Sequence, residues 1–68
     1  MRKLTERQYE VLVFMQTWLT YEEIATRMGL SENTIRTHVQ GIFRALGVSS
    51  RREAVACARK HGLLDAAK

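Results

Sequence analysis

The sequence predicts an all-α domain, and three observations predict it. Four hydroxyl residues of the type that begins helices stand before helix-like periods of apolar residues. Glycine follows three of these periods, and proline is absent from the chain. No stretch alternates polar and apolar side chains over a useful strand length. We therefore expect four helices and no sheet, at about 6–17, 21–28, 32–46 and 51–61.

Each expected helix carries its own start and stop signals. Capping boxes, in which a hydroxyl residue precedes Gln or Glu by three positions, begin at Thr5, Thr20 and Ser50. In such a box the hydroxyl accepts the amide of the fourth residue, whose side chain reaches back to the amide of the first. The third helix has a simpler N-cap, Ser31. The glycines suited to the left-handed residue that closes a helix are Gly29, Gly47 and Gly62.

Length and composition indicate a small globular domain. A chain of 68 residues forms one domain, which buries only roughly 60% of its unfolded surface. Hydrophobic residues make up 46% and charged residues 26%, which argues against a disordered class. A single cysteine, Cys57, leaves no internal disulfide and fits a reducing cytoplasm. The longest apolar run, 11–15, is too short to span a membrane, so we expect a cytoplasmic protein without a membrane partner.

The second and third expected helices are joined by only three residues, Gly29-Leu30-Ser31. Two helices joined by a tight turn that contains glycine form the helix-turn-helix layout. Ala25 is small where the two helices cross, so they can approach closely. The apolar side chains expected to seal the joint are those of Ile24, Met28, Leu30 and Ile35.

The third expected helix separates into two faces when it is projected at 100° per residue. Its apolar stripe, which we expect in the core, consists of Ile35, Val39, Ile42 and Leu46. The opposite side carries polar side chains that we call the outward arc: Asn33, Arg36, Thr37, Gln40 and Arg44. Gly41 falls among them, and we expect it to remove bulk and permit close approach of a ligand.

The outward arc has side chains suited to double-stranded DNA. A merely solvated helix face usually mixes Glu and Lys in i,i+4 pairs, whereas this arc has no acidic residue beyond its first turn. Arginine pairs with guanine edges, glutamine pairs with adenine, and threonine offers a hydroxyl and a methyl group. Residues 31–68 also carry seven basic and three acidic side chains, whereas residues 1–30 carry four of each. This excess of positive charge favours a polyanionic partner.

Motifs over nearly the whole chain resemble one known family. They are Leu4-Thr5-x-Arg7-x-x-Glu10-Val11-Leu12, Glu23-Ile24-Ala25, Gly29-Leu30-Ser31-x-x-Thr34-Ile35-Arg36-x-His38, Ile42-x-x-x-Leu46-Gly47-Val48 and Ser50-Arg51-x-Glu53-Ala54-Val55. With this spacing, residues 4–64 resemble the C-terminal DNA-binding domain of the LuxR/FixJ (NarL-type) bacterial transcription regulators. The resemblance implies a four-helix domain whose third helix lies in the major groove.

By position, the resemblance also assigns site residues. We expect contacts to base edges from Arg36, Thr37 and Gln40, with Asn33 of the same arc. We expect contacts to the DNA backbone, or support for them, from Ser31, Thr34, His38, Arg44 and Arg51. His38 lies on the flank of the helix, which fits a partly packed or phosphate-facing residue better than a base contact.

The resemblance implies dimerisation through the fourth helix, which is rich in small residues. Ala54, Val55 and Ala58 are expected to pack on the core. The residues left for a two-fold contact, which we expect at least on DNA, are Ala56, Cys57, Arg59, Lys60 and Leu63. Such a homodimer predicts a palindromic operator with half-sites about one helical turn apart.

The chain departs from the family pattern in three respects. Trp18 stands where the family usually has glycine, and it either packs over the end of the first helix or stays exposed. Gln8 replaces the usual glutamate, although it can still close a capping box. Family members usually carry an upstream receiver or ligand-binding domain, whereas Met1 lies three residues before the resemblance begins. We expect a short stand-alone member with one domain, 1–68, and keep an excised domain as the alternative.

The sequence also bears on catalysis, metal binding and other partners. No nucleophile has a neighbouring base, and no glycine-rich phosphate loop occurs, so we expect no enzyme and no cofactor. Cys57 and His61 share a helix face, but two ligands make no zinc site, so we expect no metal. One alternative is a sigma-factor-like domain that binds RNA polymerase and promoter DNA. Another is a protein-interaction module that acts on another regulator through the fourth helix or Trp18.

Overall fold

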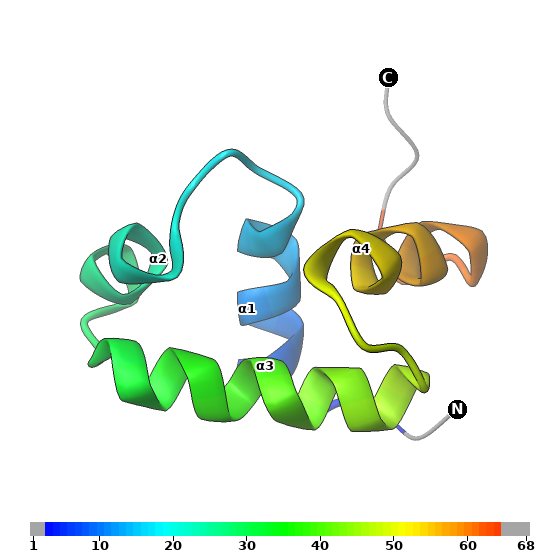
Figure 1. The fold of residues 1–68 in the computed structure, drawn as a ribbon, viewed down its shortest axis with the longest axis horizontal. Helices are drawn as coiled ribbons and strands as arrows, with labels where there is room; N and C mark the ends of the chain where they lie inside the picture. Colours follow the sequence, from blue (N-terminus) through cyan, green and yellow to red (C-terminus); the bar gives the residue numbers. More distant parts are fainter. Residues whose placement is uncertain (1–2, 65–68) are drawn as a thin grey trace.

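The computed structural model describes residues 3–64 and forms four helices over them. They are α1 (Glu6–Met15), α2 (Tyr21–Met28), α3 (Glu32–Leu46) and α4 (Arg51–Lys60). The long α3 runs along one edge, and α1, α2 and α4 all pack against it from the same side (Figure 1). Within residues 3–64 there is no strand, and the predicted all-α class is confirmed.

The core lies between α3 and the other three helices. The predicted apolar stripe of α3 is buried in full, as are Val11 and Leu12 of α1 and Ile24 of α2. Ala54 and Ala58 of α4 are completely buried, so small side chains let α4 approach the core closely. Met28 and Leu30 are partly buried against this core, which confirms the predicted seal of the helix-turn-helix joint.

The helix-turn-helix geometry depends on Gly29, which has a left-handed backbone with φ of 69°. A side chain at this position would be strained, because L-residues rarely adopt positive φ. The turn is closed by the amide of Leu30, which donates to the carbonyl of Ala25 at 2.9 Å. Ala25 is buried, so its small size allows α2 and α3 to cross as predicted.

Two of the three predicted capping boxes are complete. In the first, Thr5 Oγ1 accepts from the Gln8 amide and Gln8 Oε1 accepts from the Thr5 amide. In the second, Thr20 and Glu23 make the same reciprocal pair. The backbone amide and then the hydroxyl of Thr20 donate to the Glu23 carboxylate, and they lower its pKa below the ordinary value.

The third predicted box is wrong in one of its two bonds. Ser50 Oγ accepts from the Glu53 amide as expected. The Glu53 carboxylate, however, accepts from the hydroxyls of Ser50 and Ser49 and from the Ser49 amide, rather than from the Ser50 amide. The preceding serine thus supplies competing donors. The Ser50 hydroxyl, followed by Ser49, lowers the pKa of Glu53.

Two predicted helix ends are too late. The first helix ends at Met15 rather than 17, because the amide and the hydroxyl of Thr17 both donate to the carbonyl of Phe14 and close a tight turn. The fourth helix ends at Lys60 rather than 61. There Gly62 has φ of 75°, and the amide of Leu63 donates to the carbonyl of Ala58 at 2.8 Å.

Candidate nucleic-acid interface

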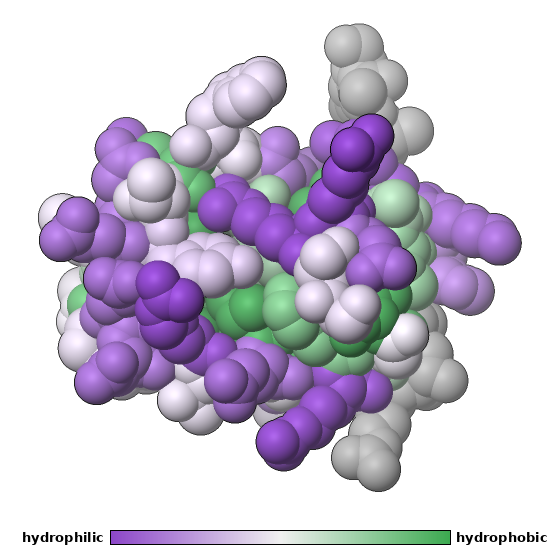
Figure 2. Space-filling model, viewed as in Figure 1, coloured by the Kyte–Doolittle hydropathy of each residue, from purple (hydrophilic) through white to green (hydrophobic). Residues whose placement is uncertain are grey.

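The outward arc is exposed along the whole of α3. All five of its side chains are exposed, and they lie on the side of α3 away from the buried stripe. Figure 2 shows that hydrophilic residues cover most of the face in view, with a hydrophobic strip across its middle. The fold therefore presents these polar groups together on one 15-residue helix.

Hydrogen bonds order the first turns of α3. Ser31 Oγ accepts from the Thr34 amide at 3.1 Å and lies 2.9 Å from the Thr34 hydroxyl. The Thr37 hydroxyl donates to the carbonyl of Asn33 at 3.0 Å. A hydroxyl that donates in this way can still accept a hydrogen bond, so Thr37 retains an acceptor for a base or a phosphate-bound water.

Arg36 is held in place by two neighbours. Its Nε and Nη2 atoms donate to Glu32 Oε2 at 2.9 and 2.7 Å, and its guanidinium lies 5.4 Å from the centre of the Tyr21 ring. The ion pair is exposed, and an exposed i,i+4 pair contributes only about 0.3–0.5 kcal/mol. A guanine edge can therefore displace Glu32 at small cost.

Arg51 has an internal role that sequence reasoning missed. Its Nε donates to the carbonyl of Met15 and its Nη2 to the carbonyl of Thr17, each at 3.0 Å. These bonds tie the start of α4 to carbonyl groups at the end of α1, which a helix leaves without partners. The guanidinium also lies 5.3 Å from the centre of the Tyr21 ring. The expected contact of Arg51 with phosphate stays a prediction.

Tyr21 contacts both Arg36 and Arg51. It begins α2 and is partly buried, with the guanidinium groups of Arg36 and Arg51 over its ring. The spacing of Glu32 and Arg36 offered a local signal for their pair. No local signal could show the contacts of Tyr21, because its two arginines come from other helices.

Gly41 does not clear space for a ligand, and this expectation is wrong. A Cβ at Gly41 would lie 2.4 Å from Nε2 of Gln8, on α1. The missing side chain therefore makes room for another part of the same fold. Of the remaining predicted backbone residues, His38 is partly buried on the flank of α3, whereas Arg44 is exposed.

The predicted dimer residues of α4 do not share one environment. Ala56, Arg59 and Lys60 are exposed, whereas Leu63 is partly buried beyond the end of the helix. Cys57 is turned toward α3, with its Sγ 3.9 Å from the carbonyl of Leu46. Any two-fold contact through α4 would therefore be centred on its exposed residues.

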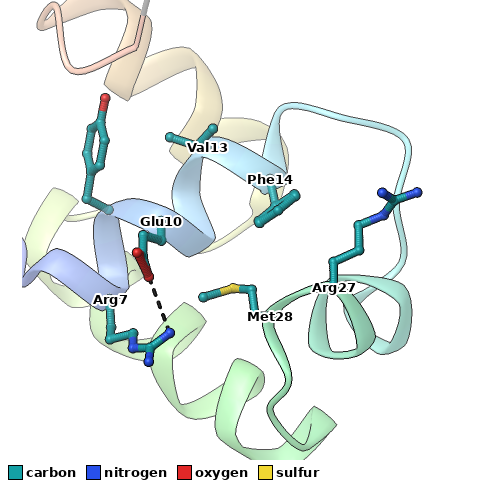
Figure 3. A pocket seen from close by; sticks show the side chains of 7 residues that line it. Arg7, Glu10, Val13, Phe14, Arg27 and Met28 are labelled. Carbon is teal, nitrogen blue, oxygen red and sulfur yellow. Dashed lines mark hydrogen bonds and ion pairs between the residues drawn. The ribbon is translucent and has the colours of Figure 1, made fainter.

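A separate hollow lies between α1 and α2 (Figure 3). Phe14 of α1 and Met28 of α2 both line it, and Arg7 at its rim pairs with Glu10 at 3.4 Å. None of its lining residues belongs to α3, so it lies apart from the outward arc. Among residues 3–64 no three potential ligands gather around a metal position, and no helix is long and apolar enough to cross a membrane.

Comparison with known proteins decides the family. Residues 2–58 match the family model of bacterial regulatory proteins, luxR family. The chain belongs to this family. Its helix-turn-helix is thus of a kind that binds DNA in transcription regulation, and the family is one of regulators rather than enzymes.

Individual relatives of this luxR-family chain agree with the assignment. It is 33% identical over 57 residues to the HTH-type transcriptional regulator MalT of Yersinia pestis (strain Pestoides F), covering 84% of the chain and 6% of that protein. It is 39% identical over 56 residues to the probable transcriptional regulatory protein SgaR of Hyphomicrobium methylovorum. That match covers 82% of the chain and 26% of SgaR. The crystal structure of response regulator ChrA, from a heme-sensing two-component system, superposes with a TM-score of 0.88 and 31% identity. That match covers 94% of the chain and 32% of the ChrA chain.

Proposed function

We propose that this chain binds double-stranded DNA sequence-specifically and regulates transcription, with α3 in the major groove. The observation that carries the proposal is the outward arc, five exposed polar side chains on one side of a helix whose other side is packed on the core. An α-helix fits the major groove, where each base pair presents a distinct pattern of donors and acceptors. The bacterial cytoplasm, where such DNA lies, is the location we propose.

The residues divide into two groups by their expected contacts. We assign base edges to Arg36, Thr37, Gln40 and Asn33, all exposed on α3. We assign the DNA backbone to Ser31, Thr34, His38, Arg44 and Arg51. The Tyr21 ring beneath the Arg36 guanidinium orients this side chain before binding, so it loses less side-chain freedom on binding.

Selection of bound sequences from a random pool of DNA duplexes tests this proposal. The pool contains every short site, so neither the operator nor the regulated gene has to be known. We expect a preferred sequence that binds at least a thousandfold more tightly than random DNA, roughly the lower limit for specific regulators. Recovery of a pool that stays random, despite salt-dependent binding, would overturn sequence-specific recognition.

We further propose that two copies bind a palindromic operator through α4. Exposed Ala56, with Lys60 beside it and Leu63 beyond, supports a close two-fold contact. Sedimentation with a single half-site and with a full palindrome measures the stoichiometry and cooperativity. We expect cooperative binding of two copies when half-sites lie about one helical turn apart. Two independent binding events on the palindrome would contradict the dimer but not the DNA proposal.

A further inference from the structure

The surface opposite α3 carries the most exposed large hydrophobic side chain of the described residues. Trp18 lies in the segment between α1 and α2 and is fully exposed. Figure 1 places this segment at the edge of the molecule opposite α3, so DNA bound by the outward arc would not cover it. An exposed tryptophan commonly marks a surface where a partner is bound, because it supplies a large contact area.

A hollow runs from Trp18 to one face of α4, and we call it the Trp18 groove. Its α4 wall is formed by Arg51 and, along the helix, by Arg52, Val55, Ala56 and Arg59. The last four positions have the spacing i, i+3, i+4 and i+7, so they share one helix face. The apolar pair is thus flanked by two exposed arginines, which lie about 10 Å apart along the helix axis.

Charge indicates which partner this groove suits. Among the described residues that line it, three are arginines and none is acidic. Arg51 already donates to carbonyl groups of α1, so Arg52 and Arg59 are the cations left facing solvent. Carboxylate groups of a partner would complement these two exposed arginines.

We propose that the Trp18 groove binds an acidic segment of a partner protein. The segment presents two carboxylates about two helical turns apart, with an apolar side chain between them. The carboxylates meet Arg52 and Arg59, while the apolar side chain lies between Val55, Ala56 and Trp18. This contact and the proposed two-fold contact both use Ala56, so a bound acidic segment competes with a second copy of the chain for this part of α4.

A defined peptide tests the proposal directly. The probe is a synthetic helical peptide with Glu at two positions seven residues apart and Leu at the third and fourth positions after the first Glu. A matched peptide has Lys in place of both Glu residues. Trp18 is the only tryptophan of the chain, so its fluorescence reports binding in the groove without a label. We expect a saturable blue shift with the acidic peptide and none with the basic one.

Paired variants separate this groove from overall charge. Arg52→Glu and Arg27→Glu change the net charge equally, and both positions are exposed, but only Arg52 lines the groove. We expect Arg52→Glu to weaken peptide binding at least tenfold and to allow the basic peptide to bind. Arg27→Glu is expected to change the affinity for the acidic peptide less than twofold. Circular dichroism checks that both variants fold.

Several outcomes overturn the proposal, and none bears on DNA recognition by α3. They are equal losses in the two variants, equal binding of the two peptides, or no saturable shift. Displacement of the peptide by random DNA would assign the groove to nucleic acid instead. A Trp18 spectrum that changes on dilution of the protein alone would assign it to a second copy.

Discussion

The outward arc and the Trp18 groove both present arginines, but their neighbours differ. In the arc, Arg36 and Arg44 share a helix face with amide and hydroxyl side chains, and Arg36 also contacts Glu32 and the partly buried Tyr21 ring. No large apolar residue is exposed on this face. In the groove, Arg52 and Arg59 flank apolar residues and a fully exposed tryptophan. Polar donors suit the edges of bases, whereas apolar surface suits a protein segment. Positive charge alone therefore does not identify a partner, and the residues around each arginine do.

The largest expected effect contrasts a residue beneath the arc with the residue that marks the groove. Ile35 is completely buried, and Ile35→Ala should lower the free energy of unfolding by about 2–5 kcal/mol. Trp18→Ala should change it by no more than about 0.5 kcal/mol, because an exposed side chain makes few contacts. Urea unfolding followed by circular dichroism measures both. A comparable loss in Trp18→Ala would show that Trp18 packs against the fold.

Arg51 lines the groove and shares the Tyr21 ring with Arg36 of the arc, and its replacement gives the next largest effect. Arg51→Lys keeps the charge but loses the planar fork that reaches two carbonyl groups. We expect a loss of about 1–2 kcal/mol in the free energy of unfolding. Because lysine keeps the positive charge for the proposed contact with phosphate, affinity for DNA, measured under conditions where the variant is folded, should change little. Unchanged stability together with weaker DNA binding would show that Arg51 acts mainly on phosphate.

A smaller effect tests whether Gly41 serves the fold. In a Gln8→Ala background, Gly41→Ala should raise the free energy of unfolding by about 0.5–1 kcal/mol, because alanine favours the helix more than glycine does. In the unaltered chain the new Cβ must displace the Gln8 amide from its close position, so the gain should be smaller. A double-mutant cycle with denaturant unfolding measures the difference. Equal gains in both backgrounds would show that Gln8 and Gly41 do not interact.

The smallest effect concerns pH. Hydrogen bonds from Thr20 lower the pKa of Glu23 in the folded chain, so the stabilisation is present above the unfolded pKa of roughly 4.3. It is lost as the pH falls through the lower folded value. Glu23→Gln should therefore unfold with a shallower dependence on pH below about 4.3 than the unaltered chain. If the free energy of unfolding fell equally steeply with pH in Glu23→Gln and in the unaltered chain, the capping role of the carboxylate would be contradicted.

Local signals predicted most of the fold. The bounds of α2 and α3 agree with the prediction, because their N-caps and closing glycines act within one turn of each helix end. The end of α1 could not be predicted in this way. It lies where Thr17 makes a turn without glycine and where Arg51, from a distant part of the chain, binds two carbonyl groups.

The candidate site was predicted less completely, for the same reason. Helical projection placed the five arc residues correctly on an exposed side, but it treats a helix as isolated. It therefore gave Gly41 to a ligand, although Gln8 of another helix occupies that space. It also missed Tyr21, whose importance depends on arginines of α3 and α4 that only the folded chain brings together.

The central claim is that the outward arc distinguishes DNA sequences. The most direct measurement compares the affinities of variants for the selected operator and for random DNA over a range of salt. We expect Arg36→Ala and Gln40→Ala to lose about 1–3 kcal/mol on the operator and to relax preference at particular base pairs. Arg44→Ala should weaken binding to both DNAs alike and reduce the salt slope by about one. Equal losses on operator and random DNA for all three variants would contradict the account.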